Sequence, residues 1–310
     1  MELIRSLDSF TCPASVASTG NFDGIHRGHD LLISEVRKRA QSQQVSSIIL
    51  TFEPHTRAVL EPDTPPMILT TLEEKRALVE NKGIDFLVCL SFDSRTRHMS
   101  HSDFLQKILI EKLGVRQLVM GKGHTLGKNR MSADSLHQAS GTMHFSTFVV
   151  STAASDGHTI SSTEIRRKII RGRLSEAVNL LGHPYLICTK RIRGVQQGRI
   201  QGYPTLNFAG AQPPKVTPHT GVYAAKLQFR DTMYSGALYF GNCPTLTYRK
   251  EHFEFHSFDA VTDEPSEGEP ARLWLYDFIR SDQTFATGRE LQKQISKDII
   301  TIKEFFMQER

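Results

Sequence analysis

The sequence has few cysteines and no long apolar segment. Its four cysteines, Cys12, Cys89, Cys188 and Cys243, are far apart and form no CxxC pair. A disulfide framework or a zinc site is therefore not expected, and a reducing cytoplasm is the predicted location. No apolar run approaches the roughly 18 residues that a membrane-spanning helix needs. The opening segment MELIRSLDSFTCPAS lacks the apolar core of a secretory signal, so we expect neither membrane insertion nor export.

Charge and composition narrow the class further. The 38 Lys and Arg against 33 Asp and Glu give a net charge of +5, which suits small phosphate-bearing partners. No basic stripe with interleaved aromatic residues is present, so nucleic acid is not an expected partner. Charged residues at 23% and 18 Phe exclude wholesale disorder. The 310 residues correspond to two domains at about 150 residues each, and nothing in the pattern indicates an oligomeric state.

The first part of the chain alternates strand and helix patterns. The helix at 29–41 has apolar positions at Leu31, Leu32, Val36 and Ala40. Alternation of this kind predicts an α/β domain with a doubly wound parallel sheet, in which ligands lie at the carboxyl ends of the strands. The predicted strands are 15–20, 45–52, 85–92, 115–121 and 143–150, and the predicted helices are 29–41, 72–83, 102–114, 162–173 and 174–182.

The pattern changes after about Gly182. Strand-like runs follow one another at 184–192, 221–229, 234–240, 253–258 and 271–279, with turn-rich loops between them. This pattern predicts an all-β barrel or sandwich, followed by a helix at 287–306. The acidic segment 262–270 is expected to be an exposed loop. We place the domain boundary so that the domains span residues 1–182 and 183–310.

A glycine-rich turn with two histidines occupies residues 20–30, GNFDGIHRGHD. Gly20 and Gly24 allow the backbone to approach a ligand closely, and the helix that follows offers its N-terminal N–H groups to phosphate. His26 and His29 are three residues apart, so both face the same side of that helix start. As structure alone, the segment is a turn with two surface histidines.

A second segment, ISSTEIR at 160–166, places Ser162, Thr163 and Arg166 at the start of a helix. Hydroxyl groups there can bond phosphate oxygens, and the guanidinium lies one turn further on. Taken alone, SSTE is equally a capping box that serves only the helix.

These two segments resemble the HxGH nucleotidyltransferases, and GNFDGIHRGH resembles the adenylyltransferase module of bacterial bifunctional riboflavin kinase/FAD synthetases. TFEPHT at 51–56 is similar to another segment of that family, although alone it is an ordinary loop. The sequence differs from that family at 121–132, where Gly123, His124 and Leu126 replace an acid and two aromatics of a loop that the family is expected to use to hold the flavin ring. The resemblance implies catalytic roles for His26, His29 and Arg166, ATP binding by Gly20, Asn21, Phe22, Gly24, Ser162 and Thr163, and flavin binding by Glu53 and His55.

The second half contains GVQQGRIQGYPTLNF at 194–208. Glycine-rich backbone can wrap phosphates, and the Thr205 hydroxyl and Asn207 amide are neutral oxygen donors suited to Mg²⁺. The alternative is a β-turn that leads into a strand. The segment resembles the riboflavin kinase signature GRxxGFPTAN, with Tyr203 and Leu206 in place of Phe and Ala. The resemblance implies ATP binding in this domain by Gly194, Gly198, Arg199, Gly202 and Pro204.

Two further runs follow in the order of the same family. FEFH at 253–256 is similar to the strand whose Glu is the catalytic base, which makes Glu254 the candidate. FIRSDQTF at 278–285 resembles a further segment of the family, with Asp282 where Glu is usual, and the resemblance implies that Arg280 faces the flavin. Tyr239 stands where the family usually has Asn, and the acidic loop replaces the usual DxLYG.

The resemblance covers essentially the whole chain and implies a bifunctional enzyme of flavin cofactor synthesis. The barrel would phosphorylate riboflavin to FMN, and the first domain would adenylylate FMN to FAD, with Mg²⁺ and ATP in both reactions. One alternative is that a single module is active, the kinase above all, because the 121–132 loop is altered. Another is a non-catalytic flavin- or nucleotide-binding regulator.

Overall fold

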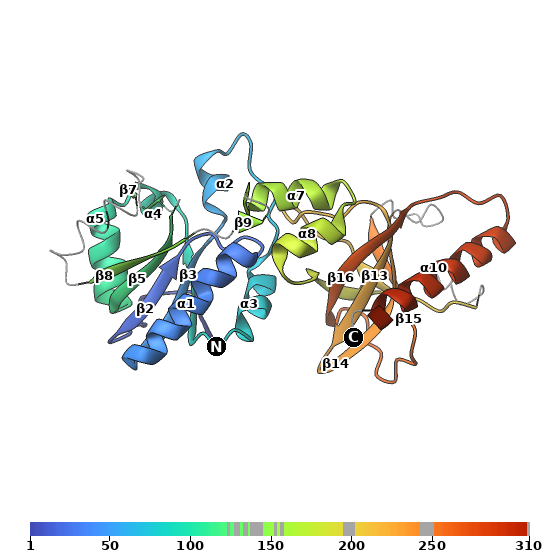
Figure 1. The fold of residues 1–310 in the computed structure, drawn as a ribbon, viewed down its shortest axis with the longest axis horizontal. Coiled ribbons are helices and arrows are strands. Elements are labelled where there is room, and N and C mark those ends of the chain that lie inside the picture. The colour runs from blue at the N-terminus through green and yellow to red at the C-terminus, as the bar shows by residue number, and fades with distance from the viewer. Residues whose placement is uncertain are drawn as a thin grey trace. The chain divides into compact units, whose positions relative to one another are not determined.

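The computed structural model describes residues 1–122, 125–126, 131–132, 136, 145–151, 154–155, 158–194, 202–241 and 251–308. The chain divides into two compact units, Met1–Ser161 and Ser162–Arg310 (Figure 1). The second unit includes α7 (Ser162–Ile170) and α8 (Leu174–Leu181), and α8 packs against two strands of its barrel. The sequence instead predicts these helices at the end of the first domain.

The first unit is built on a six-stranded sheet of order β1-β4-β3-β2-β5-β8, in which every pairing is parallel. The predicted parallel α/β fold is therefore confirmed. The short strand β1 at one edge has no counterpart in the prediction. The strands are β1 (Glu2–Ile4), β2 (Ser15–Thr19), β3 (Ser46–Glu53), β4 (Phe86–Ser91), β5 (Val115–Gly121) and β8 (Ser146–Val150). Two short pairs accompany them, β6 (Thr125–Leu126) with β7 (Met131–Ser132) and β9 (Ala154–Ser155) with β10 (His158–Thr159).

Helices connect the parallel strands. The helix predicted at 102–114 is present, and most of it is a π-helix, η1 (Phe104–Lys112). The N–H of Leu113 donates to the carbonyl of Ile108, five residues earlier, and the wider turn brings Phe104, Leu105 and Leu109 into the core. The other helices of this unit are α1 (Arg27–Gln43), α2 (Thr56–Leu60), α3 (Leu72–Glu80), α4 (Ser94–His98) and α5 (His101–Asp103).

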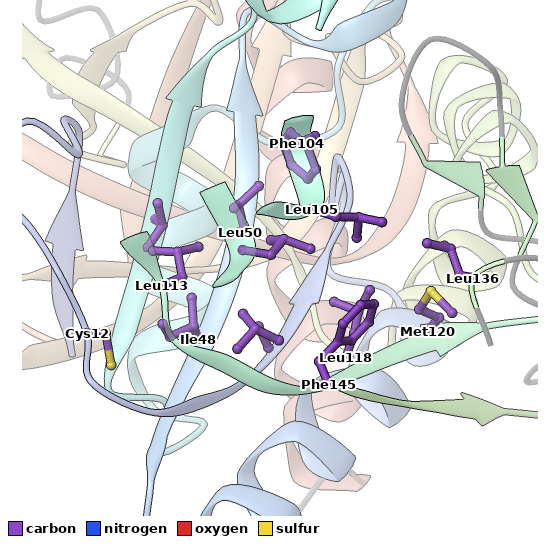
Figure 2. Close-up of a cluster of buried hydrophobic side chains, with 14 of the residues drawn as sticks. Cys12, Ile48, Leu50, Phe104, Leu105, Leu113, Leu118, Met120, Leu136 and Phe145 are labelled. Carbon is purple, nitrogen blue, oxygen red and sulfur yellow. The ribbon is translucent and has the colours of Figure 1, made fainter. Parts of the chain in front are cut away.

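The core of the first unit lies between the sheet and η1. Leu50 on β3 and Leu118 on β5 are fully buried there, together with Leu105 and Leu136 (Figure 2). Helix α1 packs against β2, β3 and β5. It buries Ile33, Val36 and Ala40, while Leu31 is 45% exposed. The predicted apolar face is therefore wrong at Leu31, and it omits Ile33, whereas Leu32 is half-buried.

The second unit is a closed antiparallel barrel of order β11-β12-β15-β14-β13-β16. The structure thus decides for the barrel rather than the sandwich. Alternate residues of β14, including Leu238 and Phe240, fill the interior, as the period of two requires. The strands are β11 (Tyr185–Ile192), β12 (Leu206–Ala209), β13 (Gly221–Phe229), β14 (Thr232–Gly241), β15 (His252–Ser257) and β16 (Pro270–Ser281).

The predicted terminal helix is present as α10 (Gly288–Gln308). It packs against the outer face of the barrel, where Ile302 is fully buried with Val222 and Ala224. The acidic segment 262–270 is an irregular loop whose residues are mostly exposed, although Pro265 is buried.

Candidate functional site

The first candidate site is the loop that follows β2. Phe22, Gly24 and Ile25 have φ angles of 45°, 88° and 42°, so the chain turns sharply there before α1 begins. The Asp23 carboxylate accepts from the backbone N–H groups of Leu69 and Thr70 at 2.8 and 3.0 Å. Asp23 is buried, and its role is therefore to fix the turn against a neighbouring segment.

The two histidines lie together at the N-terminus of α1. His26 is the N-cap, and its Nδ1 accepts from the backbone N–H of His29 at 3.3 Å. The two rings are stacked, with centroids 3.7 Å apart, and the Phe22 ring lies 5.2 Å from that of His29. Both imidazoles are thus fixed where helix N–H groups and the positive end of the helix dipole favour anions.

A buried lysine that the sequence motifs did not indicate forms a hydrogen bond to the loop after β2. Nζ of Lys75, on α3, donates to the carbonyl of Asn21 at 2.7 Å and to Oγ1 of Thr51 at 2.8 Å. Burial lowers the pKa of Lys75, while the carboxylates of Asp23 and Glu53 act in the opposite direction. A signal was available, because Lys75 follows Leu72 by three residues and so shares the apolar face of the helix.

The other candidates from this unit lie at the carboxyl end of β3. The side chain of Asn21 donates to Oγ1 of Thr56 at 2.9 Å and accepts from the Thr56 N–H at 3.2 Å, which ties the loop to α2. His55 is the N-cap of α2, and Glu53 ends the strand with an exposed side chain. Gly20 joins the same edge, because its N–H donates to the carbonyl of Leu50.

The ISST segment opens α7, which belongs to the other compact unit. Within it, Nη1 of Arg166 lies 3.4 Å from Oγ1 of Thr163, and Ser162 is half-buried at the first helical position. The altered loop at 121–132 falls mostly outside the described residues, including Gly123 and His124.

The second candidate site is a row of residues across the barrel strands. Asn207 on β12 pairs with Glu254 on β15, and Glu254 pairs with Tyr239 on β14. Tyr239 pairs in turn with Val222 on β13, which pairs with Arg280 on β16. Directly paired residues share one face of a sheet. Positions far apart in sequence are thereby brought into one line, which the motifs alone did not reveal.

A cavity of about 280 Å³ lies over this row from Glu254 to Arg280, whereas Asn207 does not line it. It is lined by Tyr239, Glu254 and Arg280 from the barrel and by Leu291, Ile295 and Ile299 from α10. Its walls combine an apolar helix face with a few polar groups, as is usual for a site that binds a small organic molecule. We call this space the ring cavity, after the flavin ring that the sequence resemblance implies.

A second pocket of about 250 Å³ adjoins the cavity. Arg191, Arg193 and Asn207 line it, together with Glu267 of the acidic loop. Thr205 lines both spaces, so the two meet at that residue. Both arginines offer positive charge to an anionic ligand, and we call this space the anion pocket.

Gly194 leaves room for the amide of Asn207. A Cβ on Gly194 would lie 2.5 Å from Cγ of Asn207 and closer still to Nδ2. Pro204 accepts through its carbonyl from Nδ1 of His256 at 2.9 Å, and Gly202 adopts a φ of +82°. The predicted residues Gly198 and Arg199 lie outside the described residues.

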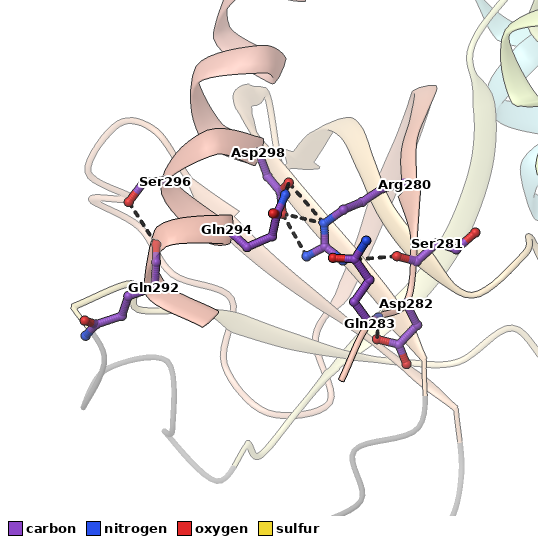
Figure 3. Close-up of polar contacts among 8 residues, drawn as sticks. All are labelled: Arg280, Ser281, Asp282, Gln283, Gln292, Gln294, Ser296 and Asp298. Atoms are coloured by element: carbon purple, nitrogen blue, oxygen red, sulfur yellow. Dashed lines mark hydrogen bonds and ion pairs between the residues drawn. The ribbon is translucent and has the colours of Figure 1, made fainter. Parts of the chain in front are cut away.

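Arg280 joins the barrel to α10 (Figure 3). Its guanidinium forms an ion pair with Asp298 through Nε and Nη2, both 2.9 Å from Oδ2. Nε2 of Gln294 also donates to Asp298, at 2.8 Å. Arg280 also lines the cavity, and its charge is paired with the Asp298 carboxylate on α10. Nearby, the Tyr239 hydroxyl donates to Asp282 at 3.2 Å.

A parallel α/β unit with two histidines at a helix N-terminus, followed by a barrel with an arginine-lined pocket, defines a two-domain protein with a candidate anion site in each domain. Residues 11–164 match the family model described as FAD synthetase, and residues 181–306 match that described as riboflavin kinase. The chain belongs to the bifunctional riboflavin kinase/FMN adenylyltransferase family.

Individual relatives agree with this assignment. The bifunctional riboflavin kinase/FMN adenylyltransferase of Escherichia coli strain K12 is 31% identical over 99% of this chain and 98% of its own. That of Pseudomonas fluorescens is 31% identical over 96% of both chains. A solved structure described as a macrolide-efflux protein from Streptococcus pneumoniae has a TM-score of 0.82 at 26% identity, over 96% of this chain and 97% of that one. Among the described residues, every helix is too short or too polar to cross a bilayer.

Proposed function

We propose that the barrel transfers the γ-phosphoryl group of ATP to riboflavin, giving FMN, and that the first domain transfers AMP from ATP to FMN, giving FAD and pyrophosphate. The observation that carries the proposal is the meeting of the ring cavity and the anion pocket at Thr205, beside Asn207 and Glu254. A phosphate donor and a flavin acceptor in these two spaces would be held with their reacting groups adjacent.

In the kinase reaction, Glu254 would accept the proton of the riboflavin 5′-hydroxyl. The hydroxyl oxygen then bonds to the γ-phosphorus, and the bond to ADP breaks with its electrons on the ADP oxygen. Arg191 and Arg193 would hold the phosphates of the nucleotide. Positioning does most of the work in such reactions, which agrees with the fixed register of Asn207 and Glu254.

Thr205 and Asn207 fit a bound magnesium ion. Both supply neutral oxygens to the same pocket, and Mg²⁺ prefers oxygen ligands while keeping several of its waters. The amide of Asn207 is also packed where a Cβ of residue 194 would stand, so its orientation is restricted. The ion would neutralise charge on the transferred phosphoryl group.

In the transferase reaction, a phosphate oxygen of FMN attacks the α-phosphorus of ATP as pyrophosphate leaves. His26 and His29 would donate to the oxygens that gain charge, from the position they share at the start of α1. The sequence resemblance also implies a catalytic role for Arg166 in this reaction, and ATP binding by Ser162 and Thr163. Gly20, Asn21, Phe22 and Gly24 would form the ATP loop, and Glu53 and His55 would border the flavin.

The two activities are assigned to residues 1–182 and 183–310, in a protein that works in the cytoplasm. The matched ranges 11–164 and 181–306 support this division, because the second begins where the proposed kinase domain begins.

Two variants test the assignment against each other. His29→Ala is expected to lower FAD formation from FMN about 100-fold or more and to spare FMN formation, since one lost donor to a developing charge costs that much. Asn207→Ala is expected to do the reverse. His98→Ala and Asn179→Ala, at exposed positions on α4 and α8, are the matched controls.

The results of these assays distinguish two separate active sites from a single active module and from a non-catalytic binding protein. Loss of both activities in either single variant, with the fold intact, would contradict separate sites. A wild-type chain that makes FMN but no FAD would leave only the kinase module active. A wild-type chain that makes neither would favour a binding protein.

A further inference from the structure

A buried histidine lies directly beside the candidate base of the kinase site. Nε2 of His252 is 3.1 Å from Oε1 of Glu254, two residues further along β15. The side chain of His252 is 7% exposed and that of Glu254 is 24% exposed. An ionised carboxylate only accepts hydrogen bonds, so Nε2–H is the donor in this contact.

The register of the barrel explains how an imidazole fits there. His252 pairs with Ala209 on β12 and with Gly241 on β14, so both strand neighbours on its face are small. Residues two apart on a strand share a face, which places the imidazole on the same side as Glu254. Burying an imidazole costs free energy unless its polar atoms are bonded, and the bond to Glu254 offsets that cost.

We propose that His252 is a positioning residue of the kinase reaction, which holds Oε1 of Glu254 so that the other carboxylate oxygen faces the ring cavity. This inference rests on the proposed function. Glu254 lines the cavity, whereas His252 is absent from the described linings of both the cavity and the anion pocket. His252 therefore acts through Glu254 and touches neither riboflavin nor ATP.

The step that depends on this geometry is the proton transfer. The 5′-hydroxyl gives its proton to the free oxygen of Glu254, its oxygen bonds to the γ-phosphorus, and ADP leaves with the electron pair of the broken bond. A carboxylate with one oxygen fixed presents the other in one direction. Without the His252 donor, the carboxylate can rotate, and the fraction of bound substrate in a reactive geometry falls.

The test compares His252→Leu, which removes the donor at similar size, with His252→Gln, which retains an N–H donor. Initial rates of FMN formation are measured in the full chain at varied riboflavin concentration, with Mg²⁺ and ATP in excess. His252→Leu is expected to lower kcat about 10- to 100-fold, by analogy with the loss of a hydrogen-bond partner that orients a metal-binding side chain. KM for riboflavin is expected to stay within about twofold of the wild-type value, because the cavity lining is intact.

His252→Gln is expected to recover most of kcat, which a purely structural role would not predict. Conversion of FMN to FAD and the thermal unfolding midpoint are measured for each variant to confirm the fold. Wild-type kcat in His252→Leu, a raised KM with unchanged kcat, or no recovery in His252→Gln would each overturn the inference.

Glu254→Gln separates this inference from the function on which it rests. If Glu254→Gln forms FMN at the wild-type rate, the base assignment itself is wrong. If Glu254→Gln is slow while His252→Leu is normal, Glu254 is the base and only the role of His252 is refuted.

Discussion

Substituting Gly194 by Ala is expected to disable the kinase site without unfolding the barrel. The added Cβ would lie 2.5 Å from Cγ of Asn207, whereas ordinary contact begins near 3.4 Å. The amide must therefore retreat by about 1 Å, and Asn207 is itself 5% exposed, with little free space around it. A misplacement of about 1 Å in a positioning group can cost about 100-fold in rate.

The assay is the rate of FMN formation from riboflavin, with conversion of FMN to FAD as an internal measure of the other domain. Gly288→Ala is the matched control, because a Cβ there meets no atom within 4 Å. We expect Gly194→Ala to lose about 100-fold in FMN formation and Gly288→Ala to lose nothing. Equal rates in the two variants would refute the argument that the absence of a side chain at Gly194 determines the position of the Asn207 amide.

Three other predictions concern buried groups. Lys75→Met is expected to lower FAD formation at least about tenfold and to spare FMN formation, since it removes two hydrogen bonds that support the loop after β2, which contains Asn21. Loss of both activities would contradict this prediction. Arg280→Met is expected to lower the free energy of unfolding in urea by about 3–5 kcal/mol, because it leaves the buried carboxylate of Asp298 without its cation, while only the neutral Gln294 amide is described as still bonded to it. The exposed Arg230→Met should cost less than about 1 kcal/mol, and similar losses in both would contradict the burial argument. Burial raises the pKa of the Cys89 thiol to about 11, so peptide mapping should find it unalkylated by iodoacetamide at pH 7.5 in the native protein and alkylated after unfolding; fast native alkylation would contradict this.

Most of the fold could be predicted from the sequence because its signals are local. Buried parallel strands such as β3 contain short apolar runs, here residues 48–50, and the alternation of strand and helix identifies the fold class. The π-helix η1 could not be predicted, since an α-helix and a π-helix differ in turn width but not in residue types. On α1, adjacent Leu31, Leu32 and Ile33 offer several apolar faces, and only packing decides that Ile33 is buried.

The candidate sites were predicted as motifs but not as geometry. Glycine turns, histidines and oxygen donors stand out in sequence. The alignment of Asn207 with Glu254 depends on strand register, which long-range pairing determines. The engagement of Arg280 by Asp298 was likewise hidden, because a charged residue on a helix such as α10 is ordinarily solvent-exposed.

The central claim is that one chain carries out both steps from riboflavin to FAD. The most direct measurement incubates the purified chain with Mg²⁺ and ATP, once with riboflavin and once with FMN, and separates the flavins by chromatography. The account predicts FAD from both substrates, with FMN as the intermediate from riboflavin. FMN that accumulates without any FAD, or FAD formed from FMN while riboflavin is untouched, would contradict it.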